Sequence, residues 1–146
     1  FIRKPFQLQS ITKSGKYEAG SKAFSYWQMR ILQLKPCIAA IKCRDDLQFN
    51  LTIEDPIGQF LPKGTGWKGC QGEYTVTFGS KSSIKKGFTA GLDTLTATIG
   101  DFTRYWLGVL SAEALNISGK FDGPDDLLKT LDRINPAPTP APEWDY

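Results

Sequence analysis

The sequence contains no histidine and only three cysteines in 146 residues. Without histidine, neither a Ser-His-Asp triad nor a Cys-His pair can form within the chain. Cys37, Cys43 and Cys70 show no CxxC spacing, and because histidine ligands are missing too, we expect no metal site. An odd number of small thiols outside a disulfide framework is typical of a cytoplasmic protein.

Long hydrophobic runs and a strong charge of one sign are also absent. No stretch approaches the roughly 18 apolar residues that a membrane span needs, and no signal-peptide pattern is present. The net charge of +3, from 18 basic and 15 acidic residues, does not predict nucleic-acid binding. Basic residues gather in 1–30 and acidic residues from Asp122 onward, which indicates either two solvated faces or contacts with a partner domain.

The composition divides the chain into three regions. Residues 1–22 are polar, and we interpret them as a connector from a preceding domain, in keeping with a first residue, Phe1, that is not Met. Residues 23–135 carry the periodic apolar patterns of one domain, and residues 136–146 form a Pro-rich C-terminal tail. A chain of this length can bury about 68–70% of its unfolded surface without disulfides.

Alternation of apolar and polar residues predicts strands over residues 26–32, 47–54, 74–78 and 94–99. In the first of these, Trp27, Met29 and Ile31 are expected to face the core. The Gly-rich residues 62–72 are interpreted as a hairpin with bulges, and residues 79–91 as a loop.

Helical spacing is predicted for residues 36–42, 101–109, 111–115 and 125–134. Asp101 is the expected N-cap of the second helix. Residues 116–121 are expected to be extended, with Ile117 facing inward. The elements together predict an α+β fold, in which helices cover one face of an antiparallel sheet of about five strands, as layered packing requires.

Candidate chemistry inside residues 1–135 is sparse. Gly64–Gly69 lacks the phosphate-loop pattern, and no helix follows it. The carboxylates of Asp45-Asp46 and of Asp125-Asp126 are expected to point apart. Apolar side chains on facing elements could form either a packed core or a cavity for an apolar ligand. These side chains are Phe102, Tyr105, Trp106, Phe49 and Leu51.

The tail combines proline at alternate positions with an aromatic and acidic end, Glu143-Trp144-Asp145-Tyr146. Alternating proline favours polyproline II, which advances about 3.1 Å per residue, so the tail could reach about 34 Å from Asn135. Disordered segments are usually poor in aromatic residues. The tail is therefore either a frayed end or a stem that delivers its terminus to a distant site.

Several short motifs resemble those of a known domain family. They are residues 27–31 followed by 36–40, the strand 47–55 ending in Asp-Pro, residues 94–99 with 105–108 and 111–115, residues 118–120, and the helix 127–134. Together they resemble the sterol-carrier-protein-like C-terminal domain of acetyltransferases of the enhanced-intracellular-survival (Eis) type. Ile2–Phe6 resembles the junction from the preceding domains. The chain departs from the family pattern over residues 58–91.

The resemblance implies that the catalytic site would be shared between this chain and other domains. Family members carry two preceding GNAT domains that bind acetyl-CoA, and because this chain has no pyrophosphate loop, it would hold no cofactor itself. The C-terminal carboxylate of Tyr146 would act as the general base toward an amine. Glu143, Trp144 and Asp145 would anchor the tail, and the negative charge of Glu143 and Asp145 would suit a polycationic amine.

Two functions therefore remain open. The first is a C-terminal accessory domain of an Eis-type N-acetyltransferase, with the preceding GNAT domains as partners and no complete active site in this chain. The second is a stand-alone sterol-carrier-like module that binds a lipid or another apolar ligand. The sequence leaves the acyl acceptor and a homo-oligomeric state undetermined.

Overall fold

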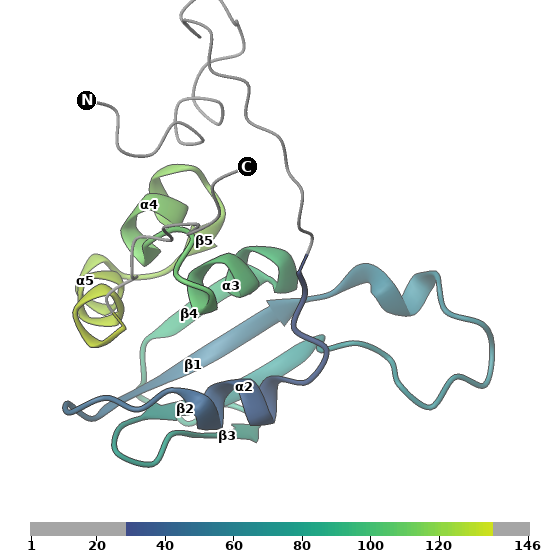
Figure 1. Ribbon diagram of the computed structural model, residues 1–146, viewed down its shortest axis with the longest axis horizontal. Coiled ribbons are helices and arrows are strands. Elements are labelled where there is room, and N and C mark those ends of the chain that lie inside the picture. Colours follow the sequence, from purple (N-terminus) through teal and green to yellow (C-terminus); the bar gives the residue numbers. More distant parts are fainter. Residues whose placement is uncertain (1–28, 136–146) are drawn as a thin grey trace, which may run out of the picture.

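A mixed sheet of five strands organises the structure, a computed structural model that describes residues 29–135 (Figure 1). The strand order is β3-β2-β1-β4-β5. The bounds are β1 Leu47–Glu54, β2 Gly72–Phe78, β3 Ser83–Lys86, β4 Thr94–Thr98 and β5 Phe121–Asp122. The expected α+β class and the approximate strand number are confirmed.

The expectation of an antiparallel sheet is wrong at its centre. β1 pairs antiparallel with β2 but parallel with β4, where Leu51 lies opposite Leu95. The chain reaches β4 by crossing over β2 and β1, and the Asn50 side chain holds that crossing by donating to Thr89 O and accepting from Thr89 N, each at 2.9 Å. Thr75 adds a hydrogen bond from Oγ1 to Gly87 O at 2.8 Å. Parallel and antiparallel strands alternate in the same way, so the pattern could not reveal this.

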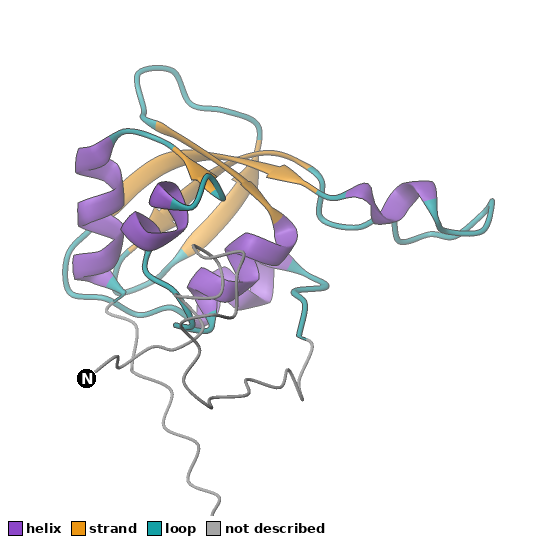
Figure 2. Ribbon diagram, turned by 90° about the horizontal axis from the view of Figure 1, so that it is seen from above, coloured by secondary structure: helices purple, strands orange, loops and turns teal. Residues whose placement is uncertain are grey.

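The two faces of the sheet differ in polarity. Along β1, Phe49, Leu51 and Ile53 are buried, whereas Gln48 and Glu54 on the opposite face are exposed. The buried face continues in Val76, Phe78, Leu95 and Ala97. The helices lie on this apolar face (Figure 2). The core therefore sits between one sheet face and the helices, as predicted.

The described residues form four α-helices: α2 Leu34–Ala40, α3 Ile99–Trp106, α4 Ala112–Ile117 and α5 Asp125–Ile134. The last has the predicted bounds, and the other three lie near the predicted positions with shifted ends. Thr98, rather than the expected Asp101, is the N-cap of α3. Thr98 Oγ1 accepts from Asp101 N at 3.2 Å and donates to the Asp101 carboxylate at 2.7 Å. The helix starts earlier than expected because Thr98, which lies in the predicted strand 94–99, serves as its cap.

The predicted strand over residues 26–32 fails in the part that is described, residues 29–32. Ile31 is buried as expected, but Met29 is 63% exposed. The backbone here bonds to side chains instead of a neighbouring strand: Ile31 N donates to Thr103 Oγ1 at 3.2 Å, and Leu32 O accepts from Trp67 Nε1 at 3.0 Å.

Two further expectations are corrected in the second half of the chain. Ile117, expected to face inward on an extended segment, ends α4 and is 84% exposed. The short strand β3 lies inside residues 79–91, which were expected to be a loop. Ile84 is the only large apolar residue of β3, so an edge strand of this kind leaves almost no alternation to detect.

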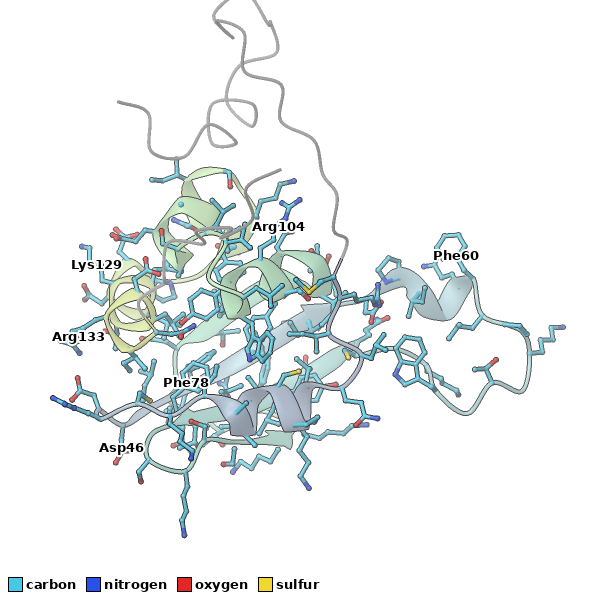
Figure 3. All side chains as sticks on the ribbon, viewed as in Figure 1. Asp46, Phe60, Phe78, Arg104, Lys129 and Arg133 are labelled. Atoms are coloured by element: carbon cyan, nitrogen blue, oxygen red, sulfur yellow. The ribbon has the colours of Figure 1, made fainter. Side chains whose placement is uncertain are left out.

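Residues 55–71, which we call the arm, extend away from the sheet between β1 and β2 (Figure 1). The arm contains the 3-10 helix η2, Pro56–Gln59. The Gly-rich part forms turns and coil rather than the expected hairpin. Phe60 projects from the arm and is 77% exposed (Figure 3).

Candidate functional site

The tail residues predicted to take part in catalysis lie outside the described residues. Glu143, Trp144, Asp145 and Tyr146 all belong to residues 136–146, and the connector 1–22 is likewise outside residues 29–135. Their roles stay predictions. The described part can show what the rest of the domain offers.

Four of the five candidate cavity residues pack into the core: Phe49, Leu51, Phe102 and Tyr105. Their exposures are between 0% and 1%. The Phe102 and Tyr105 rings lie 6.1 Å apart, and Tyr105 lies 5.8 Å from Phe121. The Tyr105 hydroxyl donates to Leu131 O at 3.0 Å, and burial raises the pKa of this hydroxyl above its ordinary value. These residues thus belong to the packed core, and the Tyr105 hydroxyl ties α3 to α5.

The fifth candidate, Trp106, lines an open groove of about 350 Å³. Its indole Nε1 donates to Cys37 O at 2.8 Å, which fixes the ring between α3 and α2. The other walls are mainly apolar and include Met29, Leu32, Pro36 and Leu107. A volume of this size is near the lower end of small-molecule sites, which usually span about 300–1,000 Å³.

The buried carboxylate of Asp55 connects three separate parts of the described chain. Its carboxylate accepts from Cys70 N at 2.7 Å and from Ile57 N at 3.1 Å, and it pairs with the Arg30 guanidinium. Burial opposes ionisation of Asp55, but the hydrogen bonds from Arg30, Cys70 and Ile57 outweigh it, so the pKa of this carboxyl lies below its ordinary value. Asp55 therefore joins both ends of the arm to the segment that precedes α2.

Sequence reasoning missed this node. In the sequence, Asp55 appears only at the end of the strand 47–55, because its partner Arg30 is 25 residues away. Gly69 is part of the same arrangement, but its role shows only in the structure: its φ of +87° favours glycine, and a Cβ added there would lie 2.5 Å from Asp55 Oδ2. Asp132 has a similar structural role, since it accepts from Ala112 N at 2.6 Å and Glu113 N at 3.0 Å at the start of α4.

The carboxylates of Asp55 and Asp132 stabilise the fold, because both accept hydrogen bonds from backbone N–H groups. Within residues 29–135, no group of His, Cys, Asp or Glu could hold a metal ion. Every buried side-chain nitrogen or oxygen of this part has a hydrogen-bond partner. Asp45, one member of an adjacent pair, lies 3.9 Å from Arg133 in an exposed ion pair. In this part of the chain no helix is long and apolar enough to cross a membrane.

No protein-family model matches the chain, and no curated protein matches it. Solved structures do resemble it. A probable N-acyltransferase from Enterococcus faecalis is 27% identical, with a TM-score of 0.58 over 72% of this chain and 25% of that one.

Two structures described as GCN5-related N-acetyltransferases share the fold at lower identity. The protein from Anabaena variabilis is 17% identical, with a TM-score of 0.60 over 76% of this chain and 26% of its own. The protein from Kribbella flavida is 20% identical, with a TM-score of 0.56 over 72% of this chain and 26% of its own. The chain therefore spans about a quarter of the length of the solved structures it matches.

Proposed function

We propose that this chain is the sterol-carrier-like C-terminal accessory domain of an Eis-type N-acetyltransferase that works in the cytoplasm. The observation that supports this most is the size of the match. The chain aligns over 72–76% of its own length with only a quarter of each acyltransferase. The remaining three quarters of such a protein would contain the GNAT domains and the acetyl-CoA site.

The catalytic contribution of this domain is the carboxylate of Tyr146. Titratable groups with lowered or strongly raised pKa in residues 29–135, such as Asp55 and Tyr105, are bonded within the fold. A terminal carboxylate is ordinarily ionised above about pH 3.3–3.7, and partial burial would raise its pKa toward that of a useful base. Glu143, Trp144 and Asp145 would hold it within hydrogen-bond reach of the substrate amine.

The negative charge at the end of the tail indicates the substrate class. Glu143 and Asp145 add two carboxylates beside the terminal one. A local negative potential raises the concentration of cations at a site. We therefore expect the acyl acceptor to be an amine that carries more than one positive charge.

Truncation of the tail in the parent protein tests the proposal. Removal of residues 144–146 should lower kcat by about 10²–10⁴-fold, the usual contribution of a general base. Tyr146→Phe keeps the carboxylate and should retain most of the activity, whereas one glycine added after Tyr146 displaces the carboxylate and should not. Equal rates for the parent and the truncated form would rule out a catalytic tail. The 146-residue chain alone should transfer no acetyl group.

The groove beside Trp106 is the observation in favour of the alternative, a module that binds a lipid or another apolar ligand. It is an apolar hollow of about 350 Å³ in the described fold. Mass spectrometry of organic extracts from the purified chain would detect a retained ligand. A ligand in stoichiometric amount would favour the alternative, and its absence would favour the accessory domain.

A further inference from the structure

The groove lies where the described chain begins. Met29 and Leu32, which line it, are 63% and 58% exposed. Exposed side chains of this size in a mainly apolar hollow mark a surface that is covered by another segment or molecule.

Both walls of the groove are held in place by hydrogen bonds. Residues 29–33, which we call the leading segment, form one wall. Arg30 pairs with Asp55, and Ile31 N donates to Thr103 Oγ1 at 3.2 Å, so the backbone of this segment is fixed against α3. On the opposite wall, Trp106 is fixed by its bond to Cys37 O at 2.8 Å. The groove is therefore formed before anything enters it, and an occupant would not have to order its walls.

Chain connectivity restricts what can occupy it. Trp27 is joined to Met29 through a single residue, so their Cα atoms lie within about 7 Å, because an extended residue spans at most about 3.6 Å. By the same limit Phe24 lies within about 18 Å of Met29. The four residues from Phe24 to Trp27 include three aromatic ones, counting Tyr26. An aromatic segment is thus tethered directly beside an apolar groove, which gives it a high effective concentration there.

We propose that residues 24–27 occupy this groove, with Phe24 and Trp27 packed against Met29, Leu32 and Trp106. Docking would cover the exposed apolar side chains and extend the core beyond the residues of the sheet and helices. It would also fix the direction in which the connector leaves the domain. If the proposed function holds, this contact sets how the preceding domains are oriented relative to the one that carries the tail.

Cys37 is a built-in reporter of the occupied state, because it lines the groove and is partly exposed. The experiment measures the rate at which iodoacetamide alkylates Cys37 in the full 146-residue chain, by peptide mass spectrometry. Lys42 and Lys68 place Cys37 and Cys70 on separate tryptic peptides. Cys70 is 4% exposed, so its rate reports unfolding of the whole domain.

In the double variant Phe24→Ala/Trp27→Ala, the Cys37 rate should rise by about tenfold, because the docked segment then loses most of its buried apolar area. The Cys70 rate should not change. Phe1→Ala/Phe6→Ala is the matched control, since it removes two aromatic residues from the same connector and should leave the Cys37 rate unchanged. The single variant Trp27→Ala should give an intermediate rate if the double variant folds poorly.

Three results would overturn the inference. One is the same Cys37 rate in the wild type and in the Phe24/Trp27 variants. Another is protection that grows with protein concentration, which would place a second copy in the groove. A third is loss of protection in a chain that ends at Asn135, which would place the tail there. None of these measurements involves acetyl transfer, so the docking and the proposed function can fail independently.

Discussion

At the scale of single residues, Asp55 connects the two ends of the arm to the segment that precedes α2. One carboxylate accepts hydrogen bonds from Ile57 N and Cys70 N, at the two ends of the arm, and pairs with Arg30. The Asp55 side chain is fully buried, whereas that of Arg30 is 33% exposed. Removing the carboxylate would leave buried donors without an acceptor, which costs more than the pair itself contributes.

We predict that Asp55→Asn lowers the free energy of unfolding by about 2–3 kcal/mol at neutral pH. Because folding lowers the pKa of Asp55 below its ordinary value of 3.8, the unfolded chain binds more protons near and below that pH. The stability from this group is therefore present above about pH 4 and lost as the pH falls through the folded pKa. Urea unfolding from pH 7 to pH 2.5 should show this loss in the wild type and not in Asp55→Asn.

Asp45→Asn is the matched control for that series. Asp45 is exposed and its contact with Arg133, at 3.9 Å, joins two exposed side chains. Exposed ion pairs contribute about 0–1 kcal/mol, so this variant should unfold close to the wild type. Equal losses in the two variants would contradict the role assigned to Asp55.

At the scale of elements, the junction between β4 and α3 shows how one residue can serve both. Thr98 is the last residue of the strand and the N-cap of the helix. Its hydroxyl accepts from Asp101 N and donates to the Asp101 carboxylate, so the helix starts without an intervening loop. This short connection directs the buried side chains of α3, Phe102 and Tyr105, onto the sheet.

Thr98→Ala should therefore lower the free energy of unfolding by about 1 kcal/mol, the usual effect of losing an N-cap. Thr98→Ser keeps the hydroxyl and should restore most of that loss. Denaturant unfolding followed by far-UV circular dichroism would measure both. A serine variant as unstable as the alanine variant would show that the threonine methyl group, not the cap, is what matters.

The arm is the element whose role is least explained by the core. It leaves the sheet at Asp55, returns at Cys70, and presents Phe60 to solvent. Its base is fixed by Asp55, and Trp67 bonds to Leu32 O at 3.0 Å. The arm is thus attached to the same leading segment that forms one wall of the groove.

At the scale of the whole molecule, the described sheet and helices share one hydrophobic core. Leu127, Leu128 and Leu131 of α5 are buried, and Asn135 N donates to Leu131 O at 3.0 Å as the helix ends. The core cluster combines the apolar sheet face with α2, α3, α4 and α5.

If the tail serves a site in the preceding domains, as proposed, it makes no buried contact with this one, and we predict that a chain ending at Asn135 unfolds within about 0.5 kcal/mol of the full chain. Thermal and urea unfolding of the two chains would measure the difference. A markedly less stable truncated chain would mean that the tail packs on this domain, and it would weaken the proposal that the tail serves a site in the preceding domains.

The sequence by itself determined which segments form most elements. Alternation located β1 at Leu47–Glu54, and helical spacing with an acidic first turn located α5. These signals are local, because burial on one face repeats with the period of the element. The missing histidine and the aromatic tail likewise restricted the chemistry before any fold was known.

Only the tertiary structure decided how the elements join. Asn50 is polar and faces away from the core, and its bonds to Thr89 hold the crossing that makes β4 parallel to β1. Asp55 and Arg30 meet although they are 25 residues apart. Trp106 lines a groove while Tyr105, its neighbour, is buried in the core. Contacts between distant segments leave no period in the sequence, so these features required the folded chain.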